Sequence, residues 1–269
     1  MALAAEAGGL DSIWLGDHLL YRHEAKGETG PWEAWTQLAA LAAVTERVQL
    51  GPLVACLGFH PPAVLAKMAA SIDEVSAGRF VLGIGSGWNR TEFDAFGLPF
   101  DHKVSRFEDA VAIVRPLVAG ERVTHAGDWW SATDAVLLPP PARRVPVMAG
   151  VNGPRALAAT VGWVDSWNTW YDSYGNTAEG FTTLNATIDA ACEAAGRPPA
   201  EVERSACVLV AVGGGAGERD PHYASPAIDH EALPEHLAAL EAAGADEAIL
   251  VLDPITERSI ELVCAVLAL

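Results

Sequence analysis

Residues 79–100 read Arg-Phe-Val-Leu-Gly-Ile-Gly-Ser-Gly-Trp-Asn-Arg-Thr-Glu-Phe-Asp-Ala-Phe-Gly-Leu-Pro-Phe. The run from Phe80 to Ile84 is apolar without polar alternation, which is typical of a parallel strand buried on both faces. Glycines then recur at every second position, so a flat or anionic ligand could approach the backbone where the strand ends. The stretch predicts a buried strand with a ligand site at its carboxyl end.

The residues of this expected site carry glycine, stacking, hydrogen-bonding and ionisable groups in close succession. They are Gly85, Gly87, Trp88, Asn89 and Glu92. The glycine spacing is not the dinucleotide fingerprint Gly-x-Gly-x-x-Gly, which opens a helix and has an acid about 20 residues further on. Spaced glycines alone are equally typical of a tight turn, so the spacing by itself leaves both interpretations open.

Length and composition limit the classes of protein. With 269 residues, 51% of them hydrophobic, the chain can bury one large core, and we expect a single domain over residues 1–269. The net charge of −18, without any Lys/Arg cluster, argues against nucleic acid or an anionic membrane as partner. No apolar run approaches the about 18 residues of a membrane span, and the start lacks the basic residues of a signal peptide. We therefore expect a cytoplasmic protein.

The four cysteines are far apart and form no Cys-x-x-Cys pair, so neither a disulfide framework nor a zinc site is indicated. We expect reduced thiols, mostly in the core. Cys56 has no basic residue near it in sequence, which argues against a catalytic thiolate. The spacing of His18, His23 and Glu24 fits no usual ligand pattern, so we expect no metal site.

Strand and helix alternate along the chain, which requires a parallel sheet with right-handed crossovers. Seven strands are expected, near residues 12, 48, 80, 145, 164, 206 and 247, one fewer than the eight that close a TIM barrel. Helices are expected at 31–44, 62–77, 103–119, 177–195, 231–243 and 255–268. In the first of them Trp32 and Trp35 fall on one apolar face. We expect an irregular excursion at 121–143 and a glycine-rich mobile loop at 213–229.

The string from Gly78 to Phe100 closely resembles the bacterial-luciferase-like family of flavin- and deazaflavin-dependent oxidoreductases. The resemblance extends over essentially the whole chain and is most specific at residues 17–18, 79–100 and 149–168. It implies an α/β fold, the (β/α)8 TIM barrel of the luciferase-like type. Members of the family begin with a strand before the helix that corresponds to residues 4–8 here, so the expected barrel apparently lacks its first strand.

Active sites of TIM barrels lie at the carboxyl ends of the strands. Asp17 and His18 follow the first visible strand and place a carboxylate beside an imidazole that could donate a proton at neutral pH. The alternative is a loop cap and a surface histidine. The resemblance implies that this pair lies against the ring of a deazaflavin, with His18 protonating or orienting the substrate and Asp17 fixing His18.

Two further segments are expected to hold the cofactor. Leu53 and Val54 end a strand at the point where relatives can carry a non-proline cis peptide that supports the ring. Gly150, Val151, Asn152 and Gly153 separate a strand from a helix, where free backbone N–H groups and the helix dipole favour a phosphate. An ordinary turn is the alternative, but the adjacent Arg155 and the resemblance favour the phosphate.

The resemblance implies hydride transfer between coenzyme F420 and an unidentified small organic substrate. F420 is favoured over FMN because Asp17-His18 looks like the deazaflavin-using branch. His18, Asp17 and Glu92 form the expected catalytic group, and Trp88, Asn89 and Glu92 are expected to shape the substrate side. Trp88, Trp167, Trp170 and Tyr171 could line an aromatic substrate pocket, and the alternative for one or two of them is packing at the barrel rim.

The alternatives are an FMN-dependent monooxygenase and a barrel that binds flavin without turnover. The expected partner is a small molecule, and a homodimer is possible because the family commonly forms dimers.

Overall fold

The computed structural model describes residues 1–23, 27–215 and 225–268, and most of the loop expected at 213–229 lies outside these residues. The chain divides into two compact units. Unit 1 comprises Met1–Ile13 and Val161–Leu269, and unit 2 comprises Trp14–Thr160. The single domain expected for residues 1–269 stays a prediction.

Unit 2 contains the buried strand expected at Phe80 to Ile84. This strand, β6 (Leu82–Gly85), is buried at every position and pairs in parallel with β5 (Ala55–Cys56) and β9 (Val147–Ala149). β1 (Ser12–Leu15) and β4 (Gln49–Pro52) pair with each other, and an isolated parallel bridge joins Leu50 to Phe80. All four strands expected near residues 12, 48, 80 and 145 are confirmed.

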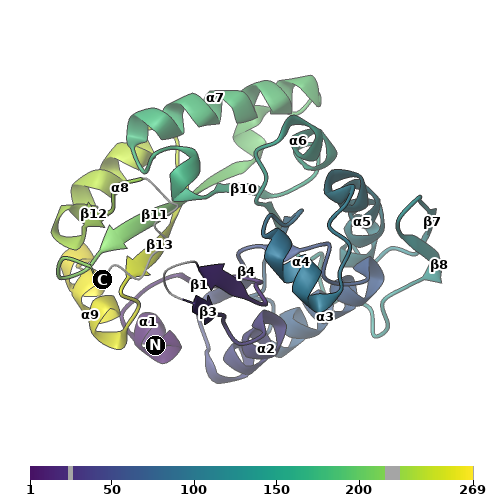
Figure 1. Ribbon diagram of the computed structural model, residues 1–269, viewed down its shortest axis with the longest axis horizontal. Helices are drawn as coiled ribbons and strands as arrows, with labels where there is room; N and C mark the ends of the chain where they lie inside the picture. The colour runs from purple at the N-terminus through teal and green to yellow at the C-terminus, as the bar shows by residue number, and fades with distance from the viewer. Residues whose placement is uncertain (24–26, 216–224, 269) are drawn as a thin grey trace. The chain divides into compact units, whose positions relative to one another are not determined.

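The helices of unit 2 are α2 (Ala34–Val44), α3 (Pro62–Val75), α4 (Arg90–Phe96), α5 (Lys103–Val118) and α6 (Pro154–Thr160), and Figure 1 shows this succession from purple to teal. Here α3 packs against α2 and α5, α5 also packs against α6, and α4 contacts β2 (Tyr21–His23). The apolar faces of α3 and α5 are buried, with Leu65 and Ile113 fully shielded from solvent. Pro116 lies in the last turn of α5.

The first helix of unit 2 begins three residues later than expected. Both carboxylate oxygens of Glu33 accept hydrogen bonds, from the N–H groups of Trp35 and Thr36 at 2.7 Å each, so Glu33 is the N-cap. Trp32 precedes the cap and is 84% exposed. The expectation that Trp32 shares a buried face with Trp35 is therefore wrong.

The irregular excursion expected at 121–143 contains an antiparallel hairpin, β7 (Val123–Ala126) and β8 (Ser131–Ala135). Asp109 of α5 accepts a hydrogen bond from the N–H of Trp129 at 2.8 Å, and the Arg106 guanidinium lies 4.2 Å from the centre of the Trp129 ring. These contacts fasten the hairpin to α5. A second hairpin joins β2 (Tyr21–His23) to β3 (Gly27–Thr29).

Unit 1 holds the remaining parallel strands. β11 (Glu203–Ala211) pairs with β10 (Ser166–Thr169), β13 (Glu247–Asp253) and β12 (Ile228–Asp229). The strands expected near residues 164, 206 and 247 are thereby confirmed.

Figure 1 shows the helices of unit 1 along one side of β11 and β13. These helices are α7 (Ala178–Ala194), α8 (Leu233–Ala242) and α9 (Glu257–Leu267), and α1 (Ala2–Ala7) packs on α9. The described residues of this unit also form the short 3-10 helices η1 (Tyr171–Ser173), η2 (Pro199–Glu201) and η3 (His230–Ala232).

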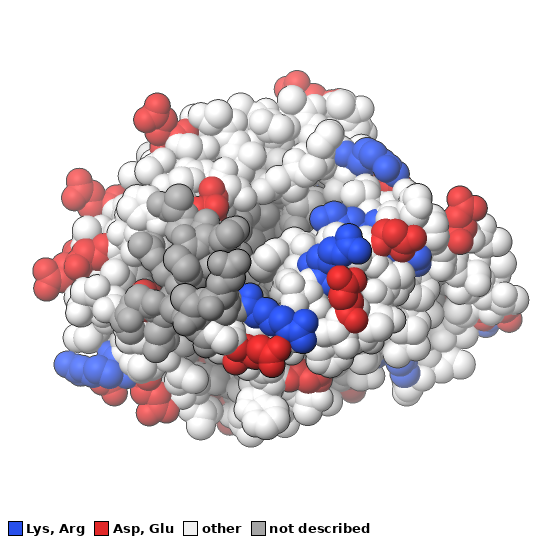
Figure 2. Space-filling view, in the orientation of Figure 1, with Lys and Arg blue, Asp and Glu red and all other residues white. Residues whose placement is uncertain are grey.

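Charge is distributed differently over the two units. Unit 1 has 4 Lys and Arg against 20 Asp and Glu, whereas unit 2 has 13 against 15. In Figure 2, Lys and Arg gather over the part of unit 2 that carries α4 and α5, and mainly Asp and Glu are visible over the helices of unit 1. None of the helices described for the chain has the length and apolar character needed to cross a bilayer.

Candidate functional site

A histidine paired with a buried carboxylate lies just beyond the end of β1. Nδ1 of His18 is 2.9 Å from Oε1 and 3.2 Å from Oε2 of Glu92, which belongs to α4 and is 1% exposed. An ionised carboxylate can only accept hydrogen bonds, so Nδ1 carries the hydrogen of the imidazole. Nε2 is then the nitrogen that can take up or release a proton.

The same carboxylate holds the backbone that follows His18. Glu92 accepts hydrogen bonds from the N–H groups of Leu19 and Leu20, and Nδ2 of Asn89 donates to the Leu20 carbonyl at 3.0 Å. Asn89 and Glu92 were expected to shape the substrate side. Their contacts instead fasten the segment that carries His18 to the start of α4.

The electrostatic state of Glu92 follows from these bonds. Burial by itself raises the pKa of Glu92, but the hydrogen bonds from His18, Leu19 and Leu20 and the attraction of His18 outweigh burial. The net effect is a pKa below the usual value. Glu92 is therefore a carboxylate at neutral pH and orients the imidazole.

Asp17 has a different partner from the one expected. Its buried Oδ2 accepts a hydrogen bond from the N–H of Cys56 at 2.9 Å and lies 4.0 Å from Nε2 of His60. Burial raises the pKa of Asp17 above its usual value, although the Cys56 bond and the neighbouring histidines oppose that shift. The expected role of fixing His18 belongs to Glu92, and Asp17 ties its own loop to β5.

Val54 lies in a cradle made by glycines. The peptide bond between Leu53 and Val54 is cis, at the position where the family resemblance allowed such a bond. Both side chains are partly exposed. A Cβ atom on Gly85 would lie 2.6 Å from Cγ2 of Val54, and one on Gly150 would lie 2.8 Å from Cγ1. The missing side chains therefore make room for Val54.

Gly87 is likewise shaped by protein packing rather than by an open ligand space. Its φ is +76°, and a Cβ there would lie 2.6 Å from Sγ of Cys56 and 2.9 Å from the ring of Phe93. The expectation that Gly85 and Gly87 clear space for a ligand is wrong in its mechanism, because side chains of the protein fill that space.

The segment Gly150 to Gly153 retains only part of its expected phosphate-binding character. The Gly150 N–H donates to the Ile84 carbonyl at 2.9 Å, so this group belongs to the sheet. Asn152 and Gly153 are exposed, and a Cβ on Gly153 would meet no atom within 4 Å. Arg155, which was expected to support a phosphate, forms an ion pair with Glu108, with Nε 3.2 Å from Oε1.

Aromatic rings flank the imidazole of His18. The ring centre of Tyr21 is 4.8 Å away, and Trp88, which is 55% exposed, meets the imidazole edge-on at 5.7 Å. Sequence reasoning selected Trp88 but missed Tyr21. An aromatic residue three positions after His18, in the loop that follows a strand, was the available signal.

The aromatic residues expected from unit 1 are mostly packed within it. Trp167 is 1% exposed, and its ring centre lies 6.4 Å from that of Phe181 on α7. Tyr171 is 2% exposed and lies against Trp170, with ring centres 4.6 Å apart. Trp167 is therefore a core residue, and its expected place in a substrate pocket is wrong.

The thiols agree with the expectation from sequence. Cys56, Cys192, Cys207 and Cys264 are free and buried. Burial raises the pKa of Cys56 to about 12, so it is a neutral thiol under physiological conditions. Within residues 1–23, 27–215 and 225–268, no group of three or more His, Cys, Asp or Glu is placed to hold a metal ion.

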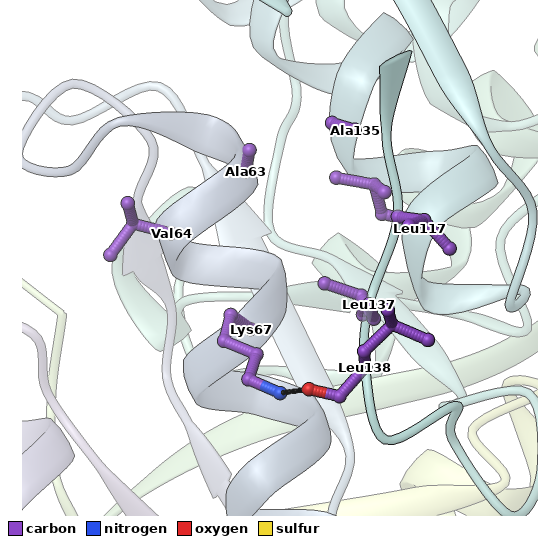
Figure 3. Close-up of a pocket in the computed structure, with 8 residues that line it drawn as sticks. Ala63, Val64, Lys67, Leu117, Ala135, Leu137 and Leu138 are labelled. Atoms are coloured by element: carbon purple, nitrogen blue, oxygen red, sulfur yellow. Dashed lines mark hydrogen bonds between the residues drawn. The ribbon is translucent and has the colours of Figure 1, made fainter.

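A cavity elsewhere in unit 2 has a different character. It measures about 300 Å³ and lies between α3, α5 and the segment after β8. Figure 3 shows its apolar lining and the hydrogen bond from Nζ of Lys67 to the Leu138 carbonyl. None of the expected site residues lines it, so it does not form part of the candidate site.

Curated relatives of the chain include two kinds of oxidoreductase. An F420-dependent glucose-6-phosphate dehydrogenase from Amycolatopsis mediterranei is 36% identical over 159 residues, which are 57% of this chain and 46% of the relative. A pyrimidine monooxygenase RutA from Allorhizobium ampelinum is 31% identical over 198 residues, which are 67% of this chain and 52% of the relative. The chain thus spans about half the length of these relatives.

The fold is shared with solved structures over nearly the whole chain. The structure of an F420-dependent secondary alcohol dehydrogenase in complex with an F420-acetone adduct has a TM-score of 0.81 at 19% identity, and the match covers 98% of this chain and 92% of that one. This likeness confirms the fold class, the α/β barrel of the luciferase-like type. Since the family model of luciferase-like monooxygenases matches residues 1–251, the chain belongs to the luciferase-like monooxygenase family.

Proposed function

We propose that this protein is an oxidoreductase that transfers a hydride between coenzyme F420 and a small organic substrate. The observation that carries the proposal is the pair formed by His18 and Glu92, in which an ionised carboxylate holds Nδ1 and leaves Nε2 for proton transfer. Support also comes from the curated relatives named as F420-dependent dehydrogenases, of which this chain spans about half.

The residues of unit 2 would divide the work. When bound, F420 supplies a ring carbon that accepts or gives a hydride. Leu53 and Val54 would support the ring, and Asn152 and Gly153, which are exposed residues, would contact a phosphate. His18 would take a proton from the substrate hydroxyl at Nε2 as the substrate is oxidised, or return it to a carbonyl oxygen in the reverse direction.

An FMN-dependent monooxygenase is the second candidate. The RutA relative, which is 31% identical over 67% of this chain, supports it. The apolar surface at Val54 would accept a flavin ring as well as a deazaflavin ring. A barrel that binds flavin without turnover is the third possibility.

Titration with F420 and with FMN, followed by fluorescence, separates these candidates. We expect F420 to bind more tightly than FMN. Tighter binding of FMN together with substrate oxygenation would favour the monooxygenase, and binding without any turnover would favour the third possibility.

The role of His18 is tested by His18→Ala. We expect turnover to fall by about 100-fold, the usual contribution of a general acid or base, while F420 affinity changes by less than about threefold. His125→Ala is the matched control, because His125 on β7 also faces a carboxylate, with Nε2 3.3 Å from Oδ1 of Asp109 on α5. Equal losses in the two variants would show that the effect is not specific to His18.

We also propose a cytoplasmic homodimer that forms one domain per chain. Light scattering at micromolar concentration measures the oligomeric state, and cell fractionation measures the location. Two separate thermal transitions would contradict a single domain.

A further inference from the structure

We infer, resting on the proposed function, that the substrate is an uncharged molecule with a planar apolar ring, and not a sugar phosphate. Two independent features carry this inference. One is the pair of aromatic rings beside the His18 imidazole. The other is that the described Lys and Arg side chains already have interaction partners within the protein.

The first feature is the pair of rings beside the proton-carrying imidazole. The ring centre of Tyr21 lies 4.8 Å and that of Trp88 5.7 Å from the ring centre of His18. Tyr21 follows the segment that Glu92 and Asn89 hold, and Trp88 directly precedes Asn89. Trp88 is 55% exposed despite its large apolar surface. A half-exposed indole beside a reactive group offers stacking and apolar contact to a ring-shaped ligand.

The second feature is that each Lys and Arg in the described part of the chain has a partner. Beside the candidate site, Arg22 pairs with Glu28, Arg90 with Asp94 and Arg155 with Glu108, while Lys103 donates to the Gly87 carbonyl at 3.3 Å. The other engaged cations are Arg47, Lys67, Arg79, Arg106, Arg115, Arg122, Arg143, Arg144, Arg197, Arg204 and Arg258.

A sugar phosphate needs cationic donors that are available to its phosphate group. Among the described cations beside the site, Arg22, Arg90 and Arg155 would first have to leave a carboxylate, and Lys103 a carbonyl. The buried negative charge of Glu92 next to His18 further disfavours an anionic substrate close to the imidazole. A neutral substrate with a ring needs no cation to be displaced from its partner, and the charge of Glu92 does not repel it.

A secondary alcohol with an aromatic ring satisfies these conditions. Its carbinol carbon would lose a hydride to the oxidised cofactor and its hydroxyl would lose a proton to Nε2 of His18, giving the ketone. The aromatic ring would lie against Trp88 and Tyr21.

The experiment compares 1-phenylethanol, 2-propanol and glucose 6-phosphate as substrates with F420. We expect kcat/KM for 1-phenylethanol to exceed that for 2-propanol by at least about tenfold, and glucose 6-phosphate to give no turnover. Trp88→Ala should lower kcat/KM for 1-phenylethanol by about tenfold and change that for 2-propanol by less than about twofold, because only the first presents a ring to the indole. Trp32→Ala, which removes an 84% exposed indole from the same unit, is the control and should leave both values unchanged.

A binding measurement makes the inference independent of turnover. Acetophenone is titrated into protein with 13C-labelled histidine, with and without F420, and the His18 imidazole signal is identified by its loss in His18→Gln. We expect acetophenone to shift that signal, and Trp88→Ala to weaken its binding by about tenfold.

Efficient turnover of glucose 6-phosphate would overturn the inference while leaving the proposed function intact. Equal losses for both alcohols in Trp88→Ala, or an unmoved His18 signal at millimolar acetophenone, would also overturn it. Failure to bind F420 would refute the proposed function, yet the titration with acetophenone would still decide whether the site accepts a neutral ring.

Discussion

Replacing Glu92 by Gln tests the central contact of the site. The carboxylate accepts from Nδ1 of His18 and from the N–H groups of Leu19 and Leu20, and it is 1% exposed. A glutamine of the same shape offers one acceptor oxygen and turns an NH2 group towards at least one of these donors. The substitution therefore removes charge-assisted bonds and leaves a buried donor unsatisfied.

The size of the effect follows from these bonds. A hydrogen bond to a charged group contributes about 1.5–3 kcal/mol, and an unsatisfied buried donor costs about 1–3 kcal/mol. We expect Glu92→Gln to lower the free energy of unfolding by about 3 kcal/mol. For a chain of this size that corresponds to a fall in Tm of about 6–12 °C.

Catalysis should suffer as well, because the substituted amide no longer fixes the hydrogen on Nδ1. We expect kcat to fall by about 10- to 100-fold.

The stability difference between the protein and Glu92→Gln should depend on pH. The folded pKa of Glu92 lies below its usual value, so its ionisation stabilises the fold above the usual carboxyl range and that stabilisation is lost as the pH falls through the lowered pKa. The difference in stability between the protein and Glu92→Gln should therefore be largest near neutral pH and shrink as the pH is lowered.

Urea unfolding at several pH values measures this difference. Glu108→Gln is the matched control, since Glu108 forms an ion pair with Arg155 at the surface and its loss should cost less than about 1 kcal/mol. A Glu92→Gln protein within 1 kcal/mol of the parent, with unchanged kcat, would refute the reasoning.

Three further predictions concern other parts of the chain. Gly85→Ala places a Cβ 2.6 Å from Cγ2 of Val54 and should lower the unfolding free energy by about 1–3 kcal/mol and weaken cofactor binding. Gly162→Ala, whose Cβ would meet its nearest atom at 3.8 Å, should do neither, and equal effects of the two changes in denaturation and fluorescence titration would contradict the cradle. Burial raises the pKa of both Cys56 and Cys207 to about 12, so a thiol reagent at pH 8 should leave these two thiols unmodified in the native protein. In urea the reagent should label all 4 cysteines, and rapid labelling of Cys56 or Cys207 in the native protein would be inconsistent with their burial. Because salt screens the repulsion among the like charges that give the chain its net charge of −18, Tm should rise by several degrees between about 0.05 and 1 M KCl. A Tm that stays constant or falls would show that this repulsion is unimportant for stability.

The elements of the fold could be predicted from local sequence because their signals are local. Short apolar runs, such as the one at Phe80 to Ile84, predicted the seven expected strands. The helical period of the segments between them predicted the main helices. One error falls at an end, at α2, where the cap at Glu33 moved the start and left Trp32 exposed. Capping depends on one side-chain geometry, which apolar periodicity does not report. The short elements α4, β2–β3 and β7–β8 were not predicted at all.

The site was only partly predictable. Asp17, His18, Trp88, Asn89 and Glu92 were selected because strand ends in such a fold carry chemistry. Which of them contact one another was a matter of tertiary structure, since His18 and Glu92 are 74 residues apart and either Asp17 or Glu92 could have held the imidazole.

The roles of the glycines and of Trp167 show the same division. The sequence alone determined that side chains are absent at Gly85, Gly87 and Gly150 and that a large ring stands at Trp167. The tertiary structure decided that Val54, Cys56 and Phe93 occupy the glycine spaces and that Trp167 packs on Phe181. A missing side chain leaves a space, and only the packing of distant segments determines whether protein or ligand fills it.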